Sequence, residues 1–240
     1  MTATARMPRI EQAGIDAWLV RLFSDIDESN MPWLTALVRR CEEDFGAALI
    51  DLVPSYTTVL VHYDPLILSA GEARARLVAL LETLSPDSGE AVQDIKELPV
   101  WYDPSVGPEL ERLERHTGWE RDKVIELHCE HVYRVFALGF APGFAFMGSV
   151  DERLALPRLE TPRRRVPQGS VAIAGRQTSA YPTMSPGGWN LVGRTPAKLF
   201  DRQRKGFSLL QVGDQVRFVS VTRQEFERLG GEVTPVEARS

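Results

Sequence analysis

Gly139-Phe-Ala-Pro-Gly-Phe-Ala-Phe-Met-Gly148 opens the stretch of sequence that decides the fold of this chain. Residues 139–196 hold 8 of the 18 glycines and 7 of the 16 prolines, so we expect the backbone to turn often here. Short runs of strand-forming residues interrupt the turns at 170–174 and 189–192, and another follows at 216–221. Many short strands joined by Gly/Pro turns are typical of a β-barrel or sandwich rather than a parallel sheet.

Two helices and a strand are expected just before this stretch. Pro108 suits the first turn of a helix that runs through Arg115. Thr117-Gly-Trp-Glu120 has the pattern of a capping box and predicts a second helix, through Leu127. Residues 131–138 alternate as a strand does. A charged tail follows from residue 223, and we expect its end to be mobile.

The first hundred residues alternate between helical and strand periods. Apolar residues at helical spacing predict a helix over 31–45, with Asn30 as its N-cap and Gly46 as its stop. Ser69 and Glu72 form the pattern of a capping box at the start of another helix. Strands are expected at 17–23, 48–53, 57–63 and 91–101.

This β-α-β-β-α-β order predicts an α+β chain of two domains. The first is a ferredoxin-like domain over residues 1–98, and the second is the β-barrel domain over residues 99–240. No chemical motif lies in the first domain, so packing and docking is the role that we expect of it.

The composition is that of an ordinary globular protein, with 43% hydrophobic and 25% charged residues. The net charge is −5, and one short basic run, at 163–165, stands out. We therefore expect neither nucleic-acid binding nor a membrane-surface role. No apolar run approaches the roughly 18 residues that a membrane helix needs. Residues 1–8 lack a signal-peptide core, and Cys41 and Cys129 form no CxxC pair, so a cytoplasmic protein is expected.

The common catalytic motifs are absent: the sequence has no P-loop, GxGxxG, HExxH or GxSxG. His128-Cys129-Glu130-His131 resembles a metal-ligand cluster, but no second pair of ligands follows at zinc-site spacing. We therefore expect no metal site. His128 is a candidate acid or base, because a helix C-terminus favours a protonated imidazole. A helix-capping histidine explains the same position without catalysis.

The glycine- and aromatic-rich loop is the first candidate for a binding site. Glycine lets backbone N–H groups approach a ligand, and the rings of Phe140 and Phe144, beside Gly143, suit an apolar pocket. A barrel corner filled by phenylalanine is an equal alternative. Polar side chains beside later glycines suit recognition of an amide or another small polar substrate: Gln177, Thr178, Ser185 and Asn190. Because no strong base or nucleophile accompanies them, binding is better supported than catalysis.

Several arginines lie close together in the same region. Arg158 and the run Arg163-Arg164-Arg165 offer guanidinium groups that bind carboxylate or phosphate through charge-assisted hydrogen bonds. A solvated basic loop is the other interpretation of this cluster.

The ordered motifs of the chain resemble those of one known family. In chain order they are Val53-Pro-Ser-Tyr56, Val61-His-Tyr-Asp-Pro65, Gly107-Pro-Glu-Leu110, Gly139-Phe-Ala-Pro-Gly-Phe144, Val166-Pro-Gln-Gly-Ser-Val171, Gln177-Thr178, Tyr181-Pro182, Ser185-Pro-Gly-Gly-Trp189 and Gly193-Arg-Thr-Pro196. On these motifs the chain is identified as a member of the KipI/PxpB family. Its members are called the B-type subunit of 5-oxoprolinase, allophanate hydrolase subunit 1 and kinase A inhibitor. The resemblance covers nearly the whole chain.

The resemblance implies a cyclophilin-like β-barrel for the second domain and the role of an enzyme subunit. The implied partners are a subunit 2 (PxpC/KipA-type) chain, expected in a heterotetramer, and a third, PxpA-type component. Such complexes hydrolyse a small amide or lactam, with 5-oxoproline as the favoured substrate and ATP with Mg²⁺ supplied through the complex. No metal or biotin is expected on this chain. Two alternatives stay open: a sensor histidine kinase inhibitor, and a carboxyltransferase-type subunit of a urea carboxylase or allophanate hydrolase system.

The resemblance also suggests roles for individual residues. His128 is the acid/base candidate, and the anion-binding candidates are Arg163, Arg165 and Arg176. The substrate-binding candidates come from the turn-rich stretch: Phe140, Gly143, Phe144, Gln177, Thr178, Ser185, Gly187, Gly188, Trp189, Asn190 and Arg194. Where the family commonly reads Gly-Gly-Gln-Thr-Gly, Arg176 and Ser179 replace two glycines here. This departure leaves the substrate open.

Overall fold

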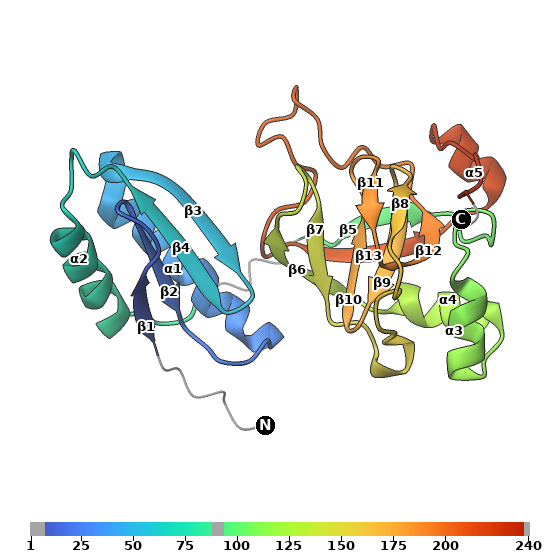
Figure 1. Cartoon of the computed structure of the whole chain (residues 1–240), viewed down its shortest axis with the longest axis horizontal. Helices are drawn as coiled ribbons and strands as arrows, with labels where there is room; N and C mark the ends of the chain where they lie inside the picture. Colours follow the sequence, from blue (N-terminus) through green and yellow to red (C-terminus); the bar gives the residue numbers. More distant parts are fainter. Residues whose placement is uncertain (1–7, 88–93, 238–240) are drawn as a thin grey trace. The chain divides into compact units, whose positions relative to one another are not determined.

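The computed structural model describes residues 8–87 and 94–237. The chain divides into two compact units, Met1–Val92 and Gln93–Ser240 (Figure 1). This division lies a few residues before the domain boundary that the sequence predicts, between 98 and 99. No helix in the described parts of the chain combines the length and the apolar character that crossing a membrane requires.

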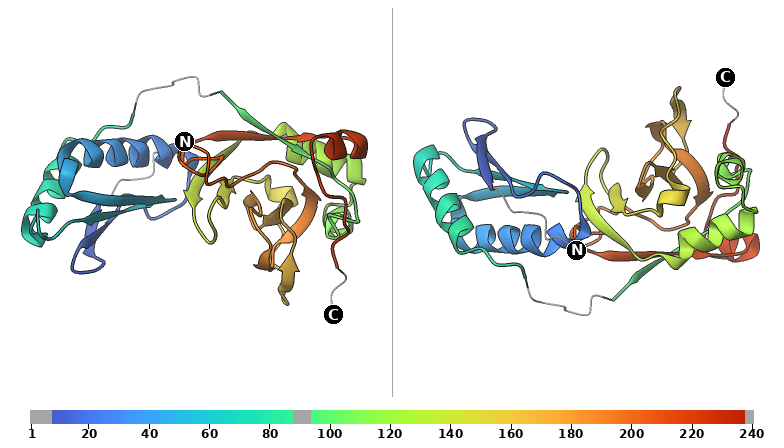
Figure 2. Two further views of the ribbon diagram at one scale, coloured as in Figure 1. Left: turned by 90° about the horizontal axis from the view of Figure 1, so that it is seen from above. Right: turned by 90° about the horizontal axis from the view of Figure 1, so that it is seen from below.

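The first unit is an antiparallel sheet with helices packed on it. Its strands lie side by side in the order β1 (Arg9–Gln12), β2 (Ala17–Arg21), β4 (Thr58–Tyr63) and β3 (Leu49–Ser55). The helix α1 (Met31–Phe45) lies along one face, and α2 (Ala70–Glu82) packs beside α1 (Figure 2). The short 3₁₀ turns η1 (Glu28–Asn30) and η2 (Gly46–Ala48) flank α1. Alternate strand residues are buried and the intervening ones half-buried, so the sheet buries one face against its helices.

The helix ends of this unit follow the sequence closely. The helix α1 begins and ends where the apolar spacing predicts, with Asn30 as N-cap and Gly46 at a φ of 49° as C-cap. The Asn30 side chain does not cap the helix, because its Nδ2 donates instead to the carbonyl of Asp25, at 2.7 Å. Ser69 and Glu72 make both bonds of the predicted capping box.

The last strand predicted for the first domain pairs elsewhere. The strand β5 (Lys96–Val100) lies parallel to β13 (Gln215–Ser220), which places it in the second unit. Leu98 stands opposite Phe218, and both side chains are buried in the core of that unit. The strand β1, which the sequence pattern missed, lies beside β2 at the edge of the first sheet. The predicted β-α-β-β-α-β order is therefore wrong in its last strand. Residues 91–93 of that prediction lie outside the described residues.

The second unit is built on a large antiparallel sheet. Its strands follow the order β6 (Tyr133–Leu138), β7 (Ala145–Gly148), β10 (Gln177–Ala180), β9 (Ser170–Ala174) and β12 (Asn190–Arg194). The strand β13 pairs with both β6 and β5, and Trp101, just after β5, exchanges two 2.9 Å backbone hydrogen bonds with Arg194 at the end of β12. These pairings close the path of strands on itself. A separate pair is formed by β8 (Arg163–Val166) and β11 (Ser185–Gly187).

The helices of the second unit differ in detail from the sequence prediction. The helix α3 (Leu110–Thr117) ends at Gly118 with a φ of 71°, and α4 (Arg121–Glu130) begins after Glu120. The predicted box of Thr117 and Glu120 is wrong, because Thr117 ends α3 and its hydroxyl donates to the carbonyl of Leu113, at 2.9 Å. The short 3₁₀ turn η3 (Glu152–Leu154) follows β7.

The charged tail holds a helix that the sequence analysis did not predict. The helix α5 (Arg223–Arg228) starts at Thr222, whose side chain accepts from the N–H of Glu225. Phe226 is fully buried, with its ring 5.5 Å from that of Trp101. This aromatic contact ties the tail to the end of β5. Residues 238–240 at the end of the tail lie outside the described part of the chain.

Candidate functional site

An aromatic cluster occupies the part of the second unit that the sequence singled out. Phe144 stands at its centre and is buried, with its ring edge-on to those of Tyr181, at 5.2 Å, and Trp189, at 5.7 Å. The cluster comprises Phe140, Phe144, Phe146, Tyr181 and Trp189. Edge-to-face geometry of this kind fixes ring orientations, so the cluster is a well-ordered core that supports the exposed ring of Phe140.

The loop before β7 brings one ring of this cluster to the surface. Phe140 is 63% exposed and has a φ of 67°, which a non-glycine residue rarely adopts. Gly143 has a φ of 84°, and a Cβ there would lie 2.8 Å from the Cβ of Phe200. The loop therefore requires glycine at this position. Phe144 fills a core, as the barrel-corner interpretation predicts, whereas Phe140 faces solvent.

The strand β11 passes very close to Tyr181. A Cβ on Gly187 would overlap the Tyr181 hydroxyl, so only glycine fits at this crossing. Burial raises the pKa of Tyr181 from 10 to about 12. The hydroxyl of Ser185, in the same strand, is buried and has no hydrogen-bond partner among the described residues.

Two backbone anchors place Arg158 beside Trp189. The N–H of Leu159 donates to the carbonyl of Gly188, at 2.7 Å, and Nδ2 of Asn190 donates to the carbonyl of Pro157, at 3.1 Å. These bonds join the two neighbours of Arg158 to the two neighbours of Trp189. The guanidinium of Arg158 lies 5.7 Å from the centre of the Trp189 ring, within cation–π range.

The side chain of Asn190 forms hydrogen bonds within the fold through both its oxygen and its nitrogen. Its Oδ1 accepts from Arg112, at 2.8 Å, and its Nδ2 also donates to the carbonyl of Ile173, at 2.9 Å. The side chain is fully buried. Asn190 therefore fixes the segment that carries Arg158 rather than offering a free amide.

His128 and Thr178 belong to a buried hydrogen-bonded chain. The Cys129 thiol donates to the Tyr102 oxygen, at 3.5 Å, and the Tyr102 hydroxyl is 2.7 Å from Nδ1 of His128. On the other side, Nε2 of His128 is 3.1 Å from the Thr178 oxygen, whose own proton goes to the carbonyl of Ala172. These partners assign a neutral imidazole with its proton on Nε2.

Burial decides the charge of His128. The side chain is 1% exposed and stacks on Phe218 at 4.7 Å, and burial lowers its pKa to about 3. The expectation that the helix end would favour a protonated imidazole is therefore wrong, because desolvation outweighs the helix dipole. Both ring nitrogens are already hydrogen-bonded, so this geometry favours a structural role.

Arg163 is committed to a buried ion pair. It makes a two-bond contact with Glu109, at 2.7 and 3.0 Å, and both side chains are less than 10% exposed. Oε2 of Glu109 also accepts from the N–H of Leu191, at 2.9 Å. The pair joins the start of α3 to β8 and β12.

The remaining predicted arginines have different surroundings. Arg176 is exposed and pairs with Glu152, at 3.2 Å. Arg165 is exposed, and its Nε is 3.3 Å from the sulfur of Met184. Arg194 is buried, and its Nη1 donates to two carbonyls of the tail, those of Glu232 and Thr234, both at 2.7 Å.

Gln177, another predicted position, follows directly after a turn. Gln177 is half-buried and starts β10 opposite Ala174, across the two-residue turn of Gly175 and Arg176. Gly175 has a φ of 55°, as the first residue of such a hairpin turn requires. The sequence marked Arg158 as one of several arginines suited to an anion but not as a neighbour of Trp189, and it did not mark Tyr181 as a site residue. The Tyr181-Pro182 motif offered a signal for Tyr181, whereas the position of Arg158 over Trp189 depends on hydrogen bonds distant in sequence.

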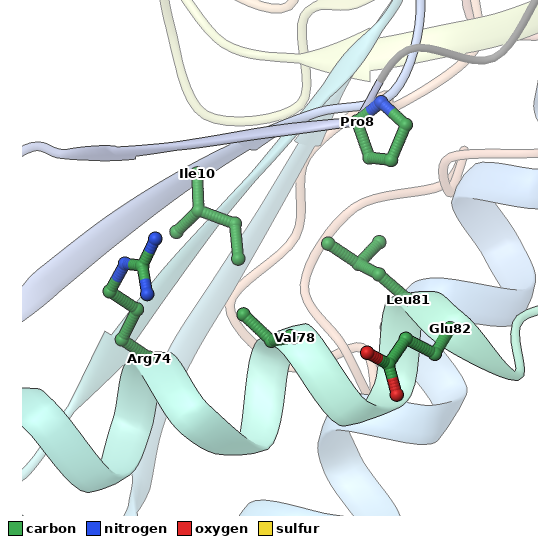
Figure 3. A pocket seen from close by; sticks show the side chains of 6 residues that line it. All are labelled: Pro8, Ile10, Arg74, Val78, Leu81 and Glu82. Atoms are coloured by element: carbon green, nitrogen blue, oxygen red, sulfur yellow. The ribbon is translucent and has the colours of Figure 1, made fainter.

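A metal centre or a pocket elsewhere would be another place for a site. Within residues 8–87 and 94–237, no group of three or more His, Cys, Asp or Glu side chains is placed to hold a metal ion. A pocket of about 390 Å³ lies in the first unit, between β1 and α2 (Figure 3). Its lining comprises Pro8, Ile10, Arg74, Val78, Leu81 and Glu82. No predicted site residue lines it.

The sequence matches a known family and curated relatives. A family model described as carboxyltransferase domain, subdomain C and D, matches residues 8–210. The B-type subunit of 5-oxoprolinase from Bacillus subtilis (strain 168) is 36% identical over 227 residues, which cover 91% of this chain and 95% of the relative. That of Escherichia coli O157:H7 is 41% identical over 174 residues, covering 71% and 78%. A putative urea carboxylase of Emericella nidulans is 24% identical over 58% of this chain and 12% of its own length.

Solved structures share the fold. A crystal structure named TTHA0988 is 36% identical, with a TM-score of 0.74 over 90% of this chain, which spans 40% of the solved one. The urea carboxylase of Kluyveromyces lactis is 21% identical, with a TM-score of 0.75 over 95% of this chain and 23% of that one. The mixed helix and sheet architecture is thus similar to part of a urea carboxylase. Together with the near full-length match to the Bacillus subtilis relative, these findings show that the chain belongs to the family of 5-oxoprolinase B-type subunits, the KipI/PxpB family that its motifs resemble.

Proposed function

We propose that this chain is the B-type subunit of an ATP-dependent complex that hydrolyses 5-oxoproline to glutamate. The observation that carries the proposal is the 36% identity to a B-type subunit of 5-oxoprolinase over 95% of that relative. The site supports it, since the exposed ring of Phe140 on an ordered aromatic cluster, with the guanidinium of Arg158 over the same cluster, suits a small ring with polar groups. An unstrained amide carbonyl is a poor electrophile, so ATP serves to phosphorylate its oxygen before water attacks.

The partners and the finer fold belong to the same proposal. The chain works with a subunit 2 (PxpC/KipA-type) partner in a heterotetramer and with a PxpA-type component, in the cytoplasm. ATP and Mg²⁺ enter through this complex. The second domain is a cyclophilin-like barrel, a proposal supported by the closed path of strands in the second unit. The first domain is a ferredoxin-like variant whose N-terminal strand β1 takes the edge.

The predicted site residues divide into two proposed roles. Phe140 contacts the substrate ring, with Ser185, Gln177 and Arg165 at its polar edge, and the buried rings of Phe144 and Trp189 support Phe140 from behind. The others hold these groups in place: Gly143, Thr178, Gly187, Gly188, Asn190, Arg163, Arg176 and Arg194. His128 is a positioning residue in this scheme, because its ring nitrogens are hydrogen-bonded to Tyr102 and Thr178.

The test is reconstitution of the complete complex. We expect the co-expressed and co-purified chain, subunit 2 partner and PxpA-type component to release glutamate from 5-oxoproline only when ATP and Mg²⁺ are present. Phe140→Ala in this chain should raise the KM for 5-oxoproline, whereas Phe207→Ala, at an exposed ring of similar backbone conformation outside the aromatic cluster, should not. An intact complex that leaves 5-oxoproline unchanged while hydrolysing another amide contradicts the proposed substrate.

A carboxyltransferase role is the second candidate. Two observations favour it: the description of the family model, and the match to the putative urea carboxylase of Emericella nidulans. That match has lower identity and coverage than the match to the Bacillus subtilis relative. It predicts carboxyl transfer between a biotin carrier and urea without glutamate release. The kinase-inhibitor alternative predicts that the chain alone, without a subunit 2 partner, lowers autophosphorylation of a sensor histidine kinase.

A further inference from the structure

Arg158 differs from other arginines that lie over aromatic rings in this protein. The comparable contacts among the described residues are Arg76 over Phe45, Arg153 over Trp119 and Arg223 over Trp101. Each of those three guanidinium groups also pairs with a carboxylate, of Asp44, Asp151 and Glu227 respectively. Arg158 has the ring of Trp189 beneath it but no ion pair within residues 8–87 and 94–237. Its charge is positioned and uncompensated.

The surrounding sequence has an excess of positive charge. Residues 155–194 contain six arginines and one acidic residue, Glu160, in a chain whose net charge is −5. Three of these arginines are engaged: Arg163 by Glu109, Arg176 by Glu152 and Arg194 by the carbonyls of the tail. The positive charge left over at the aromatic cluster favours an anionic ligand.

The backbone on both sides of Arg158 is held in place before any ligand arrives. The bonds from Leu159 to Gly188 and from Asn190 to Pro157 fix the backbone on both of its sides. The charge of Arg158 also reaches Tyr181, where it opposes the burial that raises the pKa of that hydroxyl. The backbone that carries the guanidinium is therefore ordered before binding, which lowers the ordering cost of a ligand contact.

From this arrangement we propose that Arg158 binds the carboxylate of the substrate and so selects anionic lactams over neutral ones. The inference rests on the proposed function, because the carboxylate in question is that of 5-oxoproline. A guanidinium presents two parallel N–H donors to a carboxylate, and that of Arg158 lies 5.7 Å from the centre of the Trp189 ring. The lactam ring then packs against Phe140, the exposed ring of the aromatic cluster. Phosphate is the other anion that a guanidinium binds, and the experiment separates the two.

The test compares variants within the complete complex, by steady-state kinetics in each substrate. Arg158→Gln should raise the KM for 5-oxoproline about tenfold to a hundredfold, the usual cost of losing a charged hydrogen bond. Its KM for ATP and its inhibition by 2-pyrrolidinone, a lactam without a carboxylate, should stay as in the wild type. The KM of Arg158→Lys for 5-oxoproline should fall between those of the wild type and Arg158→Gln, because lysine keeps the positive charge but lacks the two parallel N–H donors of a guanidinium. Arg153→Gln is the matched control, since Arg153 also covers a tryptophan ring but pairs with Asp151.

Each outcome decides between the two proposals. A wild-type complex that turns over 5-oxoproline, with a KM that Arg158→Gln leaves unchanged, overturns the role of Arg158 alone. A raised KM for ATP in that variant also overturns it, in favour of a phosphate contact. Equal losses in Arg153→Gln and Arg158→Gln reduce the effect to general stability and overturn the inference. A wild-type complex without 5-oxoproline turnover overturns the proposed function and the inference with it.

Discussion

At the scale of single residues, burial determines what the polar groups of the second unit do. Arg163 and Arg158 lie close in sequence, yet the first is buried against Glu109 and the second is exposed over Trp189. A buried guanidinium requires a partner within the fold, whereas an exposed one keeps its charge for a ligand. The sequence identified the arginine cluster, but it held no signal for which arginine a distant glutamate would neutralise.

The buried pair predicts that removing one of its charges destabilises the protein far more than removing both. Arg163→Met should lower the free energy of unfolding by about 3–5 kcal/mol, because it leaves the Glu109 carboxylate buried without its counter-charge. The double variant Glu109→Gln/Arg163→Met should recover most of that loss, since it removes both charges. Urea denaturation of the wild type, the single variants Arg163→Met and Glu109→Gln, and the double variant measures this. Arg164→Met, at an exposed neighbouring position, is the control and should change little. A double variant as unstable as Arg163→Met would contradict the account.

His128 predicts a pH dependence of stability with a definite sign. Its pKa is about 3 in the folded protein and near 6.5 in the unfolded chain. As pH falls below 6.5, His128 takes up a proton in the unfolded chain but not in the folded protein. The contribution of His128 to the free energy of unfolding is therefore fully present above pH 6.5 and is lost progressively toward pH 3. The slope reaches about 1.4 kcal/mol per pH unit.

The variant His128→Leu isolates this contribution. At pH 8 it should be less stable than the wild type by about 1–3 kcal/mol, because the buried Tyr102 hydroxyl loses its acceptor. The difference between the two proteins should shrink as pH falls from 6.5, since other titrating groups are common to both. Denaturant unfolding at a series of pH values measures it, and a difference that stays constant with pH would contradict the assigned charge.

At the scale of elements, local signals and distant pairings differ in what they reveal. The helix α1 and the capping box of α2 follow from spacing within a few residues, and the sequence predicted them. The strand β5 was recognised as a strand, but its partner β13 lies more than a hundred residues later, so its sheet was assigned wrongly. The helix α5 is short and charged, and only the burial of Phe226 marks its apolar side.

Two glycine-to-alanine substitutions, one in β11 and one in α2, should change the stability of the protein in opposite directions. Gly187→Ala should destabilise the protein by about 1–3 kcal/mol, because the new methyl group overlaps the buried Tyr181 hydroxyl and forces overpacking. Gly71→Ala, in the first turn of α2, meets no atom within 4 Å and should stabilise by about 0.4–1 kcal/mol through the unfolded chain. Thermal and urea unfolding measure both. Equal effects of the two substitutions would contradict the close crossing of β11 and Tyr181.

At the scale of the whole molecule, the place where the second unit begins is a testable property. The sequence puts the domain boundary between 98 and 99, whereas the compact unit starts at Gln93 and includes all of β5. Starting at 99 removes Leu98 from the core and also Lys96, whose ammonium is 2.6 Å from the Asp214 carboxylate. The first three of the five β5 residues that pair with β13 are removed by this truncation.

We therefore expect the fragment 94–240 to unfold cooperatively, with a core of its own, and the fragment 99–240 to be partly unfolded or prone to aggregate. Without half of β5, β13 presents unpaired N–H and C=O groups, an exposed edge that pairs with other chains. Circular dichroism during urea unfolding, together with gel filtration, distinguishes the two fragments, and the full-length chain serves as the reference. Equal midpoints for 94–240 and 99–240 would restore the boundary at 98, because β5 would then contribute nothing to the second unit that its last two residues do not supply.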